Sequence, residues 1–371
     1  ENVCFIHVTL LPLIKAAGEI KTKPTQQSVA KLRELGIQPD IIICRTEADL
    51  DEDNRKKIAM FCNVERKNVV AFRDVAHTIY ECPLDLRRDK IDRLVVDKIG
   101  LGHTPSPALE DWEKFVQRVI HPKHKVTIAV AGKYIELQDA YKSIYESLIH
   151  AGAHHDTKVQ IVRVEAEAIE DHGAKSVIGD VDGILVPGGF GDRGTEGKIL
   201  AAKYARENNI PYFGICLGMQ IATIEYARNV CGLKGANSTE FDKTTKHPVI
   251  CLQEEQKGVE DMGATMRLGS SESILFTGTK AADLYGNLDR IHERHRHRYE
   301  FNSDYQDRLQ DAGLVISSVS AEEGLVEIVE LPEHPFYLGA QFHPEFQSKP
   351  NHPHPLFSGF VAAALEHSQK H

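Results

Sequence analysis

The sequence lacks any apolar run long enough to cross a membrane. A bilayer requires about 18 or more consecutive apolar residues, and no stretch of the 371-residue chain reaches that length. The nearest, Asn2 to Ile14, is interrupted by His7, Thr9 and Pro12 and has no basic segment before it. It is therefore predicted to form a buried strand rather than a signal peptide, and no membrane partner is expected.

Paired cysteines and a positive net charge are also missing. The seven Cys include no CxxC pair and no repeated spacing, so they favour a reducing compartment, and we expect a cytoplasmic protein. The 44 Lys and Arg against 54 Asp and Glu give a net charge of −10, which repels a phosphate backbone, and no nucleic-acid partner is expected. A content of 42% hydrophobic and 26% charged residues is typical of globular proteins and excludes disorder, collagen and coiled coil.

Strands alternate with helices through most of the chain, which indicates parallel sheets covered on both faces. A break rich in Gly and Pro from Gly100 to Pro107 separates two such regions. We therefore predict a first domain at residues 1–100, a linker at 101–125 and a second domain at 126–371.

Three finer expectations concern particular segments. A helix is expected from Ser28 to Leu35 in the first domain and another around Trp112 to Val119 in the linker. The segment Lys246 to Ser320 loses the alternation of strand and helix and is predicted to be an antiparallel or irregular insertion. The clustered histidines are expected on solvated faces and loops: His150, His154, His155, His352 and His354.

The stretch Pro211 to Gln220 has the pattern of a nucleophile elbow with Cys in place of Ser. An apolar strand leads into Gly214-x-Cys216-x-Gly218 and then into a helix. The glycines suit a sharp strand-to-helix turn, and a helix N-terminus stabilises a thiolate. On its own the pattern leaves a second interpretation open, in which Cys216 is a small buried apolar residue.

A base and an oxyanion site are present elsewhere in the chain. An expected strand from Phe336 to Phe342 ends in His343-Pro-Glu345, which supplies an imidazole and a carboxylate to orient it. The expected strand Gly183 to Val186 ends in a Gly-rich turn whose amides could hold an oxyanion. A lone histidine is more often a surface residue and a Gly-rich turn more often a plain loop, so the combination carries the prediction.

These residues resemble the class I, triad-type glutamine amidotransferases, in which Cys, His and Glu release ammonia from glutamine through a glutamyl thioester. The resemblance covers about Val126 to the C-terminus. Three segments look like motifs of the CTP synthase family: Pro187–Gly197, Gly235–Phe241 and Glu293–Glu300. It implies two α/β domains, namely a partial P-loop-type amidoligase (synthase) domain and a flavodoxin-like class I glutamine amidotransferase domain.

The resemblance also implies roles for individual residues. The catalytic triad would be Cys216, His343 and Glu345, with the amides of Gly189 and Leu217 as the oxyanion site. The glutamine-binding residues would be Gly189, Leu217, Gly218, Met219, Gln220, Glu240 and Arg298. An Arg for the α-carboxylate and a carboxylate for the α-ammonium agree with the chemistry of glutamine.

Two other interpretations of Glu293–Glu300 stay open: a solvated charged strand, and a metal pair at His295 and His297. The metal pair is disfavoured because no third ligand is evident and the neighbouring Arg side chains repel a cation. No metal site is expected in this chain.

Nucleotide sites are implied in the same way. The segment Gly18 to Ser28 looks like a UTP-binding segment that CTP also occupies, on a loop fixed by proline, although an ordinary basic loop is the alternative. The implied UTP and CTP residues are Lys21, Thr22, Lys23, Pro24, Thr25, Gln26 and Lys57. The implied ATP residues are Arg73, Asp74 and Val75. The residues implied in activation by GTP are Lys142, Phe190 and Arg193.

One feature of the family is missing from the sequence. No GxxxxGK[ST] phosphate loop is present. We therefore expect that the phosphate-loop half of the synthase domain, with the Mg²⁺ ligands, is absent from this chain.

The function predicted from the resemblance is CTP synthesis, with ammonia from glutamine used in an ATP-dependent amination of UTP. The resemblance implies GTP as activator, CTP as feedback inhibitor, and a homotetramer that can form filaments. The alternatives are another class I glutamine amidotransferase such as GMP synthetase, a lone glutaminase, and a catalytically silent nucleotide-sensing assembly protein. The intact set of Cys216, His343 and Glu345 argues against the silent protein.

Overall fold

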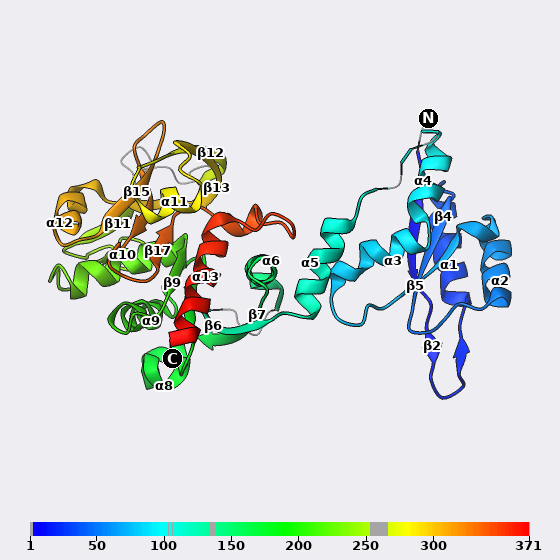
Figure 1. Ribbon diagram of the computed structural model, residues 1–371, viewed down its shortest axis with the longest axis horizontal. Coiled ribbons are helices and arrows are strands. Elements are labelled where there is room, and N and C mark those ends of the chain that lie inside the picture. The colour runs from blue at the N-terminus through cyan, green and yellow to red at the C-terminus, as the bar shows by residue number, and fades with distance from the viewer. Residues whose placement is uncertain (1–2, 103, 106, 134–137, 253–265, 371) are drawn as a thin grey trace. The chain divides into compact units, whose positions relative to one another are not determined.

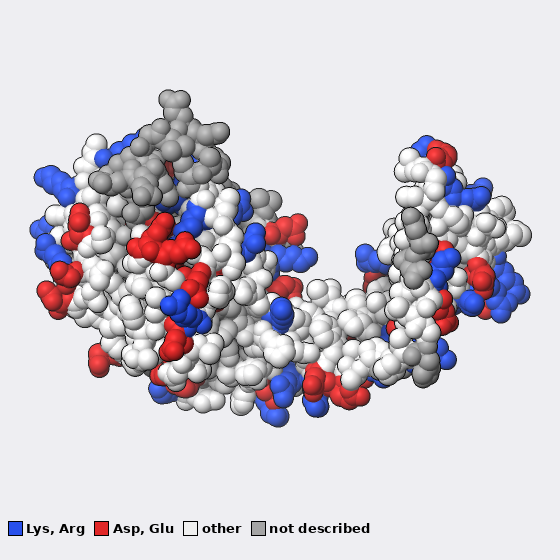
Figure 2. Space-filling view, turned by 90° about the horizontal axis from the view of Figure 1, so that it is seen from above, with Lys and Arg blue, Asp and Glu red and all other residues white. Residues whose placement is uncertain are grey.

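The computed structural model describes residues 3–102, 104–105, 107–133, 138–252 and 266–370. The chain divides into two compact units, Glu1–Ile120 and His121–His371, and each is described by itself (Figure 1). None of the described helices combines the length and the apolar character that crossing a membrane would require. On the face shown in Figure 2, basic and acidic side chains are interspersed over the surface.

The first unit contains a three-stranded parallel sheet in the order β1-β4-β5. Its core lies where Val29 and Ile58, from two helices, pack with Ile42 of the central strand, and all three are fully buried. The elements of this unit are β1 (Ile6–Leu10), β2 (Leu13–Ile14), β3 (Glu19–Ile20), α1 (Lys23–Glu34), β4 (Ile41–Thr46), α2 (Glu52–Cys62), β5 (Val69–Arg73), α3 (Cys82–Arg88), α4 (Ile91–Ile99) and α5 (Glu110–Ile120).

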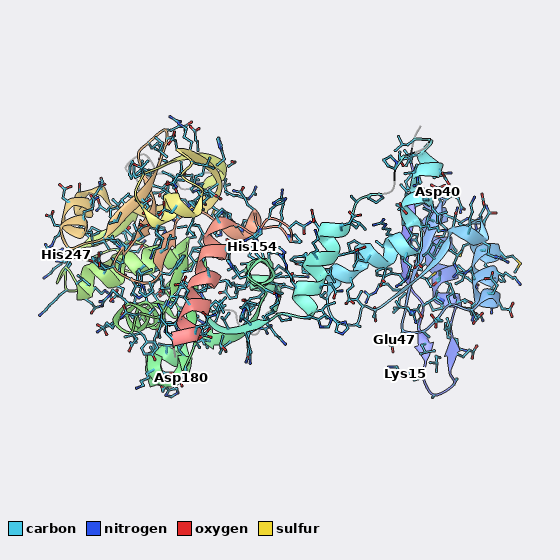
Figure 3. The ribbon with its side chains drawn as sticks, viewed as in Figure 1. Lys15, Asp40, Glu47, His154, Asp180 and His247 are labelled. Carbon is cyan, nitrogen blue, oxygen red and sulfur yellow. The ribbon has the colours of Figure 1, made fainter. Side chains whose placement is uncertain are left out.

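Charged side chains join the ends of β4 to neighbouring segments (Figure 3). Asp40, immediately before β4, accepts a 2.8 Å hydrogen bond from the Phe5 amide and lies 2.7 Å from Lys98 Nζ of α4. Past the other end of β4, Glu47 lies 2.8 Å from Lys15 Nζ in the turn after β2. The Lys15–Glu47 pair is exposed, and solvent weakens the attraction between its two charges, so it adds little to the stability of the fold.

Two expectations for this unit are wrong in detail. The run Asn2–Ile14 does not form one buried strand: β1 lies at the edge of the described sheet, and Val8 and Leu10 are 60% and 61% exposed because the described residues leave their face of the strand uncovered. The helix expected at Ser28–Leu35 begins at Lys23, so Lys23 to Gln26 lie in its first turn rather than in a loop. Pro24 suits that position because its fixed φ and missing N–H match the start of a helix.

The helix expected around Trp112 is confirmed as α5, and it packs on the first unit. Trp112 Nε1 donates a 2.8 Å hydrogen bond to the Tyr80 carbonyl, and the rings of Trp112 and Phe115 contact the Tyr80 ring. The segment 101–125, expected as a linker, therefore contains a helix that belongs to the packing of residues before it.

The second unit is built on a nine-stranded sheet in the order β13-β12-β15-β16-β17-β9-β8-β6-β7. The five strands β17, β9, β8, β6 and β7 are parallel, and the remaining four are antiparallel. The strands of this unit are β6 (His124–Gly132), β7 (Thr157–Glu165), β8 (Gly183–Val186), β9 (Tyr212–Ile215), β10 (Asn237–Ser238), β11 (Pro248–Leu252), β12 (Arg267–Leu275), β13 (Arg290–His297), β14 (Tyr299–Phe301), β15 (Val315–Ser320), β16 (Val326–Glu330) and β17 (Tyr337–Ala340).

Helices cover both faces of this sheet, as expected for a doubly covered parallel sheet (Figure 1). One face packs on α6 and α13, where Phe357 and Phe360 contact the Phe213 ring of β9. The other face packs on α7 to α10. The helices of this unit are α6 (Lys142–His154), α7 (Ala166–His172), α8 (Ala174–Ile178), α9 (Thr195–Glu207), α10 (Leu217–Asn229), α11 (Lys280–Leu284), α12 (Gln306–Asp311) and α13 (Pro355–Lys370).

The expectation for Lys246–Ser320 is confirmed in its antiparallel form. β12 pairs with β13 and with β15, and β11 pairs with β14, all antiparallel. β12, β13 and β15 extend the parallel sheet beyond β16 and β17, whereas β11 and β14 belong to a separate three-stranded sheet with β10. Residues of this segment also line the site described below.

A buried ion pair joins the two helices next to the elbow. Arg206 of α9 donates to Glu225 of α10 from Nε at 2.9 Å and from Nη2 at 2.8 Å, and the Glu225 side chain is fully buried. We expect Arg206→Met to lower the free energy of unfolding by about 3–5 kcal/mol, because a buried carboxylate loses its partner. Urea denaturation followed by circular dichroism measures the change.

The control is Lys203→Met on the same helix, where Lys203 lies 3.9 Å from the half-exposed Glu207. A loss below about 1 kcal/mol is expected there. Equal losses for the two variants would contradict the importance of the buried pair.

Candidate active site

Cys216 occupies the sharp turn between β9 and α10 in the predicted elbow. Its backbone has φ 51° and ψ −101°, an unusual conformation for a residue with a side chain. The Cys216 amide donates a 2.7 Å hydrogen bond to the Ala340 carbonyl at the end of β17. The neighbouring strand therefore holds the strained turn in place.

The two glycines of the elbow are required by close backbone contacts. A Cβ at Gly218 would lie 2.1 Å from the Val186 carbonyl oxygen, and one at Gly214 would lie 2.5 Å from the Gly218 carbonyl oxygen. Neither backbone atom can move away without disturbing the sheet. The predicted reason for the Gly-x-Cys-x-Gly pattern is thus confirmed.

His343 and Glu345 follow β17, the strand next to β9. His343 Nδ1 and Glu345 Oε1 are 2.8 Å apart, and the backbone N–H of His343 donates a 2.8 Å hydrogen bond to the backbone carbonyl of Arg294 in β13. A Cβ at Gly188 would lie 2.9 Å from His343 Cε1 and 3.5 Å from Cys216 Cβ, so both side chains border the Gly-rich turn after β8. The structure thus brings together the predicted base, nucleophile and oxyanion turn.

The charge of His343 is set by its two partners. Burial by itself lowers the pKa of His343, but the side chains of Cys216 and Glu345 raise it, and the net result is about 10. The positive charge of the His343 imidazolium therefore lies beside the Cys216 sulfur and the Glu345 carboxylate.

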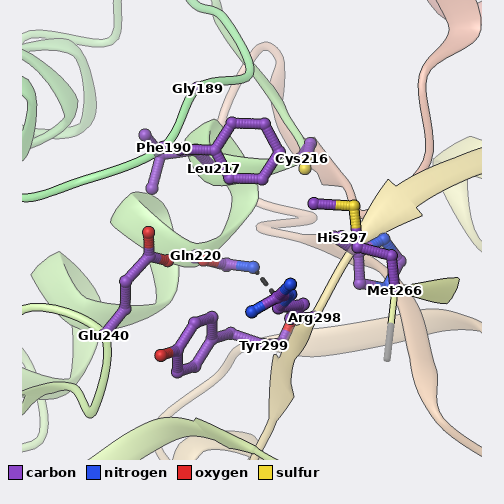
Figure 4. Close-up of a pocket in the computed structure, with 10 residues that line it drawn as sticks. All are labelled: Gly189, Phe190, Cys216, Leu217, Gln220, Glu240, Met266, His297, Arg298 and Tyr299. Carbon is purple, nitrogen blue, oxygen red and sulfur yellow. Dashed lines mark hydrogen bonds between the residues drawn. The ribbon is translucent and has the colours of Figure 1, made fainter. Parts of the chain in front are cut away.

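A cavity of about 520 Å³ opens beside Cys216 (Figure 4). Five of the predicted glutamine-binding residues line it: Gly189, Leu217, Gln220, Glu240 and Arg298. A second cavity of about 290 Å³, whose lining includes His343 and Glu345, also reaches Cys216. The nucleophile is therefore accessible although its side chain is buried.

Charged and polar groups converge on the larger cavity. Burial raises the pKa of Glu240, while the Gly191 amide at 2.9 Å and the positive charges of Lys198 and Arg298 oppose that rise. Gln220 Nε2 donates a 3.0 Å hydrogen bond to the Tyr299 carbonyl. A carboxylate and a guanidinium in one cavity suit a zwitterionic amino-acid head group.

Some site residues differ from the prediction. Gly218 and Met219 are not among the described residues that line the cavity: Gly218 packs against Val186 and Met219 against Gly339 in the core. The cavity is also lined by Phe190, Met266, His297 and Tyr299, none of which was predicted as a glutamine-binding residue, although Phe190 was predicted for GTP. Tyr299 follows Arg298 in the same motif, which was the available signal.

The solvated-strand interpretation of Glu293–Glu300 is wrong for half of its residues. In β13 the side chains alternate, and Glu293, His295 and His297 are buried while the residues between them are exposed. Burial and nearby positive charge lower the pKa of His295, so it is held neutral. Among the described residues, no group of three or more His, Cys, Asp or Glu side chains is arranged to hold a metal ion.

The clustered histidines are not all on solvated faces. His150 and His354 are buried, 6% and 4% exposed, whereas His154 and His352 are exposed. His150 Nδ1 lies 3.1 Å from Ser348 Oγ, and His354 Nε2 lies 2.9 Å from Glu293 Oε1. These contacts join α6 and β13 to the segment that follows the triad.

The residues predicted for GTP lie near the cavity in part. Phe190 lines it and is 48% exposed, while Lys142 is exposed at the start of α6. Arg193 makes ion pairs with Glu167 at 3.1 Å and Glu165 at 3.6 Å.

In the first unit, the predicted UTP residues gather around the start of α1. Lys21 Nζ is 2.7 Å from Glu19, and the positive charge of Lys57 on α2 further lowers the pKa of Glu19 after the stronger effect of Lys21. The side chains of Thr22 and Thr25 are buried, and Gln26 Nε2 donates to Thr22 Oγ1 at 3.1 Å. Lys23 is exposed and Pro24 lies in the first turn. Lys21 and Lys57 thus both lie near the Glu19 carboxylate and near one another.

The predicted ATP residues line a separate cavity of about 600 Å³. Arg73, Asp74 and Val75 lie at and after the carboxyl end of β5, where parallel sheets generally bind ligands. Arg73 Nη1 is 3.0 Å from Asp49, and Arg45 Nη2 is 2.8 Å from Asp74.

A Cys–His–Glu constellation on a strand-to-helix elbow of a parallel sheet defines a class I glutamine amidotransferase. A family model described as "Glutamine amidotransferase class-I" matches residues 136–363. A second, "CTP synthase N-terminus", matches residues 1–101.

Several relatives agree with both matches. The CTP synthase of Syntrophus aciditrophicus is 54% identical over 370 residues, which cover 100% of this chain and 68% of the relative. That of Methanocaldococcus jannaschii is 54% identical over 371 residues, covering 98% and 68%. The glutaminase domain of Trypanosoma brucei CTPS, solved with bound acivicin, is 42% identical with a TM-score of 0.61, covering 65% of this chain and 94% of that one.

The chain belongs to the CTP synthase family and carries its glutamine amidotransferase domain. Membership decides against the alternatives of a GMP synthetase and a lone glutaminase. The chain spans about two thirds of the length of these relatives, 68% in the two compared above.

The geometry makes a prediction for His343. We expect Cys216→Ala to lower the pKa of His343 from about 10, because the attraction to the sulfur is lost while burial still disfavours the imidazolium. An NMR titration measures the change, with the His343 signal assigned from a His343→Gln variant. A titration unchanged by the loss of the sulfur would contradict a thiolate–imidazolium pair.

Proposed function

We propose that Cys216, His343 and Glu345 hydrolyse glutamine, and that the ammonia released aminates UTP to CTP in an ATP-dependent reaction. The observation that supports this most directly is the 2.8 Å contact of His343 with Glu345 beside a cysteine in a strained elbow. The cavity at the elbow provides a carboxylate and a guanidinium for the glutamine head group.

The proposed chemistry begins with attack of the Cys216 thiolate on the carboxamide carbon. The amides of Gly189 and Leu217 hold the resulting oxyanion. His343 gives its proton to the nitrogen as the C–N bond breaks, which releases ammonia and leaves a glutamyl thioester. His343 then takes a proton from water, the hydroxide attacks the thioester carbon, and glutamate leaves with regeneration of the thiolate.

Residues around the cavity bind the substrate in this proposal. Glu240 and the Gln220 side chain hold the α-ammonium, and Arg298 holds the α-carboxylate. Gly218 and Met219 act indirectly, because Gly218 permits the close packing of the elbow and Met219 fills the core behind it. Phe190, Arg193 and Lys142 are the proposed contacts for GTP as an activator.

The first unit supplies nucleotide contacts in the proposal. Lys21, Lys23 and Lys57 bind the phosphates of UTP, or of CTP as a feedback inhibitor, while Thr22, Pro24, Thr25 and Gln26 shape the segment that carries them. Arg73, Asp74 and Val75 contact ATP. Homotetramers, and filaments of them, are the proposed assembly.

The described residues contain no group of three or more His, Cys, Asp or Glu side chains that could hold a metal ion, and the sequence has no GxxxxGK[ST] loop. We therefore assign no contact with Mg²⁺ or with the ATP phosphates to these residues. In the proposal, the phosphate loop and the Mg²⁺ ligands come from outside the 371 residues.

Glutamate release from glutamine at neutral pH tests the amidotransferase role. We expect Cys216→Ala to lower kcat at least about 1,000-fold, because the nucleophile is lost. Cys231→Ala is the control, since Cys231 lies outside the cavity and is only partly buried. Hydrolysis that persists without the Cys216 sulfur would overturn the mechanism, and stimulation of the wild type by GTP would support the regulatory part.

Equilibrium binding of UTP tests the nucleotide role of the first unit. We expect Lys57→Gln to weaken binding about tenfold, since one charge contact with phosphate is lost. Lys56→Gln is a matched control because Lys56 is the adjacent residue on α2, where it faces Asp53 at 3.8 Å. Equal weakening by both changes would indicate only a general charge effect.

A further inference from the structure

Gln341 is a buried polar side chain that the proposed mechanism does not use. It follows β17 directly, between Ala340, which accepts from the Cys216 amide, and the base His343. Its side chain is fully buried, and its backbone N–H donates a 2.8 Å hydrogen bond to the Glu327 carbonyl of β16. A buried side-chain amide is costly unless its hydrogen bonds are satisfied, so its partners are informative.

The partners of Gln341 connect the nucleophile with the cavity. Gln341 Nε2 lies 3.7 Å from Cys216 Sγ as a donor, and Gln341 Oε1 accepts a 3.3 Å hydrogen bond from Gln220 Nε2. Gln220 Nε2 also donates to the Tyr299 carbonyl at 3.0 Å. The chain of contacts therefore runs from Tyr299 through the two glutamines to the sulfur.

The Tyr299 carbonyl, at one end of this series of contacts, fixes the direction of every hydrogen bond in it. A backbone carbonyl can only accept, so Gln220 must present its NH₂ group to Tyr299. Both hydrogens of that NH₂ are then used, one for Tyr299 and one for Gln341, which must present its oxygen. Gln341 therefore directs its NH₂ group towards the sulfur. The reverse orientation would place the Gln341 oxygen against the Cys216 thiolate, and both are acceptors.

We propose that Gln341 is a further catalytic residue of the hydrolysis, whose Nε2 donates a hydrogen bond to the Cys216 thiolate and whose Oε1 orients Gln220 towards the substrate. This inference rests on the proposed function of the triad. A thiolate at Cys216, which is only 4% exposed, has lost most of its water and needs donors from the protein. Gln341 provides one that is independent of the proton on His343.

The same series of hydrogen bonds determines which atom of the Gln220 side chain can bind the substrate. With both hydrogens engaged, Gln220, which lines the cavity (Figure 4), has only its Oε1 left to accept a hydrogen bond from a substrate. A substrate α-ammonium bound there would polarise Gln220, then Gln341, and strengthen the donor at the sulfur. Binding of the head group and activation of the nucleophile are thereby coupled.

The test exchanges only the donor at the sulfur. In Gln341→Glu one carboxylate oxygen still accepts from Gln220, while the other faces the sulfur as an acceptor that disfavours the thiolate. The measurement is the rate of alkylation of Cys216 by iodoacetamide against pH, followed on the Cys216 peptide by mass spectrometry. We expect the midpoint of the profile to move upward by about 1 pH unit or more, with roughly tenfold slower alkylation at neutral pH.

Steady-state kinetics with glutamine separate the two roles of the side chain. Gln341→Glu should lower kcat with little change in KM, because Gln220 stays oriented. Gln341→Met removes both contacts, so it should lower kcat and raise KM, and it serves as the second variant if the first does not fold. Gln310→Glu makes the same chemical change at an exposed position of α12 and should leave the profile and the kinetics unchanged.

A folded Gln341→Glu or Gln341→Met protein with the wild-type alkylation profile would overturn the inference. Alkylation is measured without glutamine turnover, so it reports on the donor at the sulfur even if the proposed function fails. Failure of the proposed function would appear instead in the Cys216→Ala assay, as hydrolysis that persists. The two failures are therefore distinguishable.

Discussion

The backbone of Cys216 is the constraint on which the rest of the site depends. At φ 51° and ψ −101° the residue is strained, and it is held there by the Ala340 carbonyl and by backbone contacts at Gly214 and Gly218. This backbone conformation places the Cys216 sulfur beyond the end of β9, at the N-terminus of α10. Every other functional group is arranged around that point.

The order of the parallel strands delivers those groups. β9 lies between β8 and β17, with Gly214 opposite Val186 and Ile215 opposite Ala340, so the three strands end at nearly the same level. The Gly-rich turn, the nucleophile and the base each follow one of these strands. Segments that are far apart in sequence, such as Gly188 and His343, therefore meet at the sulfur.

Polar groups at this edge of the sheet are held by partners from several segments of the chain. His343 relies on Glu345 and on Arg294 of β13, and Gln341 relies on Gln220 and on Glu327 of β16. Such networks are costly when incomplete and specify a unique geometry when complete. The antiparallel insertion is thus part of the candidate site, since the residues after β13 supply Arg298 and Tyr299 to the cavity.

Much of the fold and the site could be predicted from sequence, because the signals there are local. The expected strand Gly183–Val186 has the expected bounds, and the strand and helix expected on either side of Cys216 are present as β9 and α10, since an apolar run and a glycine pattern mark them directly. Several of the wrong expectations concern burial. Val8 and Leu10 are apolar but lie on an edge strand, and His150 and His354 are polar but buried, because neighbours distant in sequence decide exposure.

The sequence by itself determined the elbow, the residue types of the proposed triad and the family resemblance, because residue types at fixed spacing carry that information. Only the tertiary structure decided which polar groups pair. The alternation along β13 that buries His295, the cavity contribution of Tyr299, and the chain from Tyr299 to the Cys216 sulfur all require strands separated by tens of residues to adopt one register. Hydrogen bonds depend on distance and direction in space, which no spacing along the chain specifies.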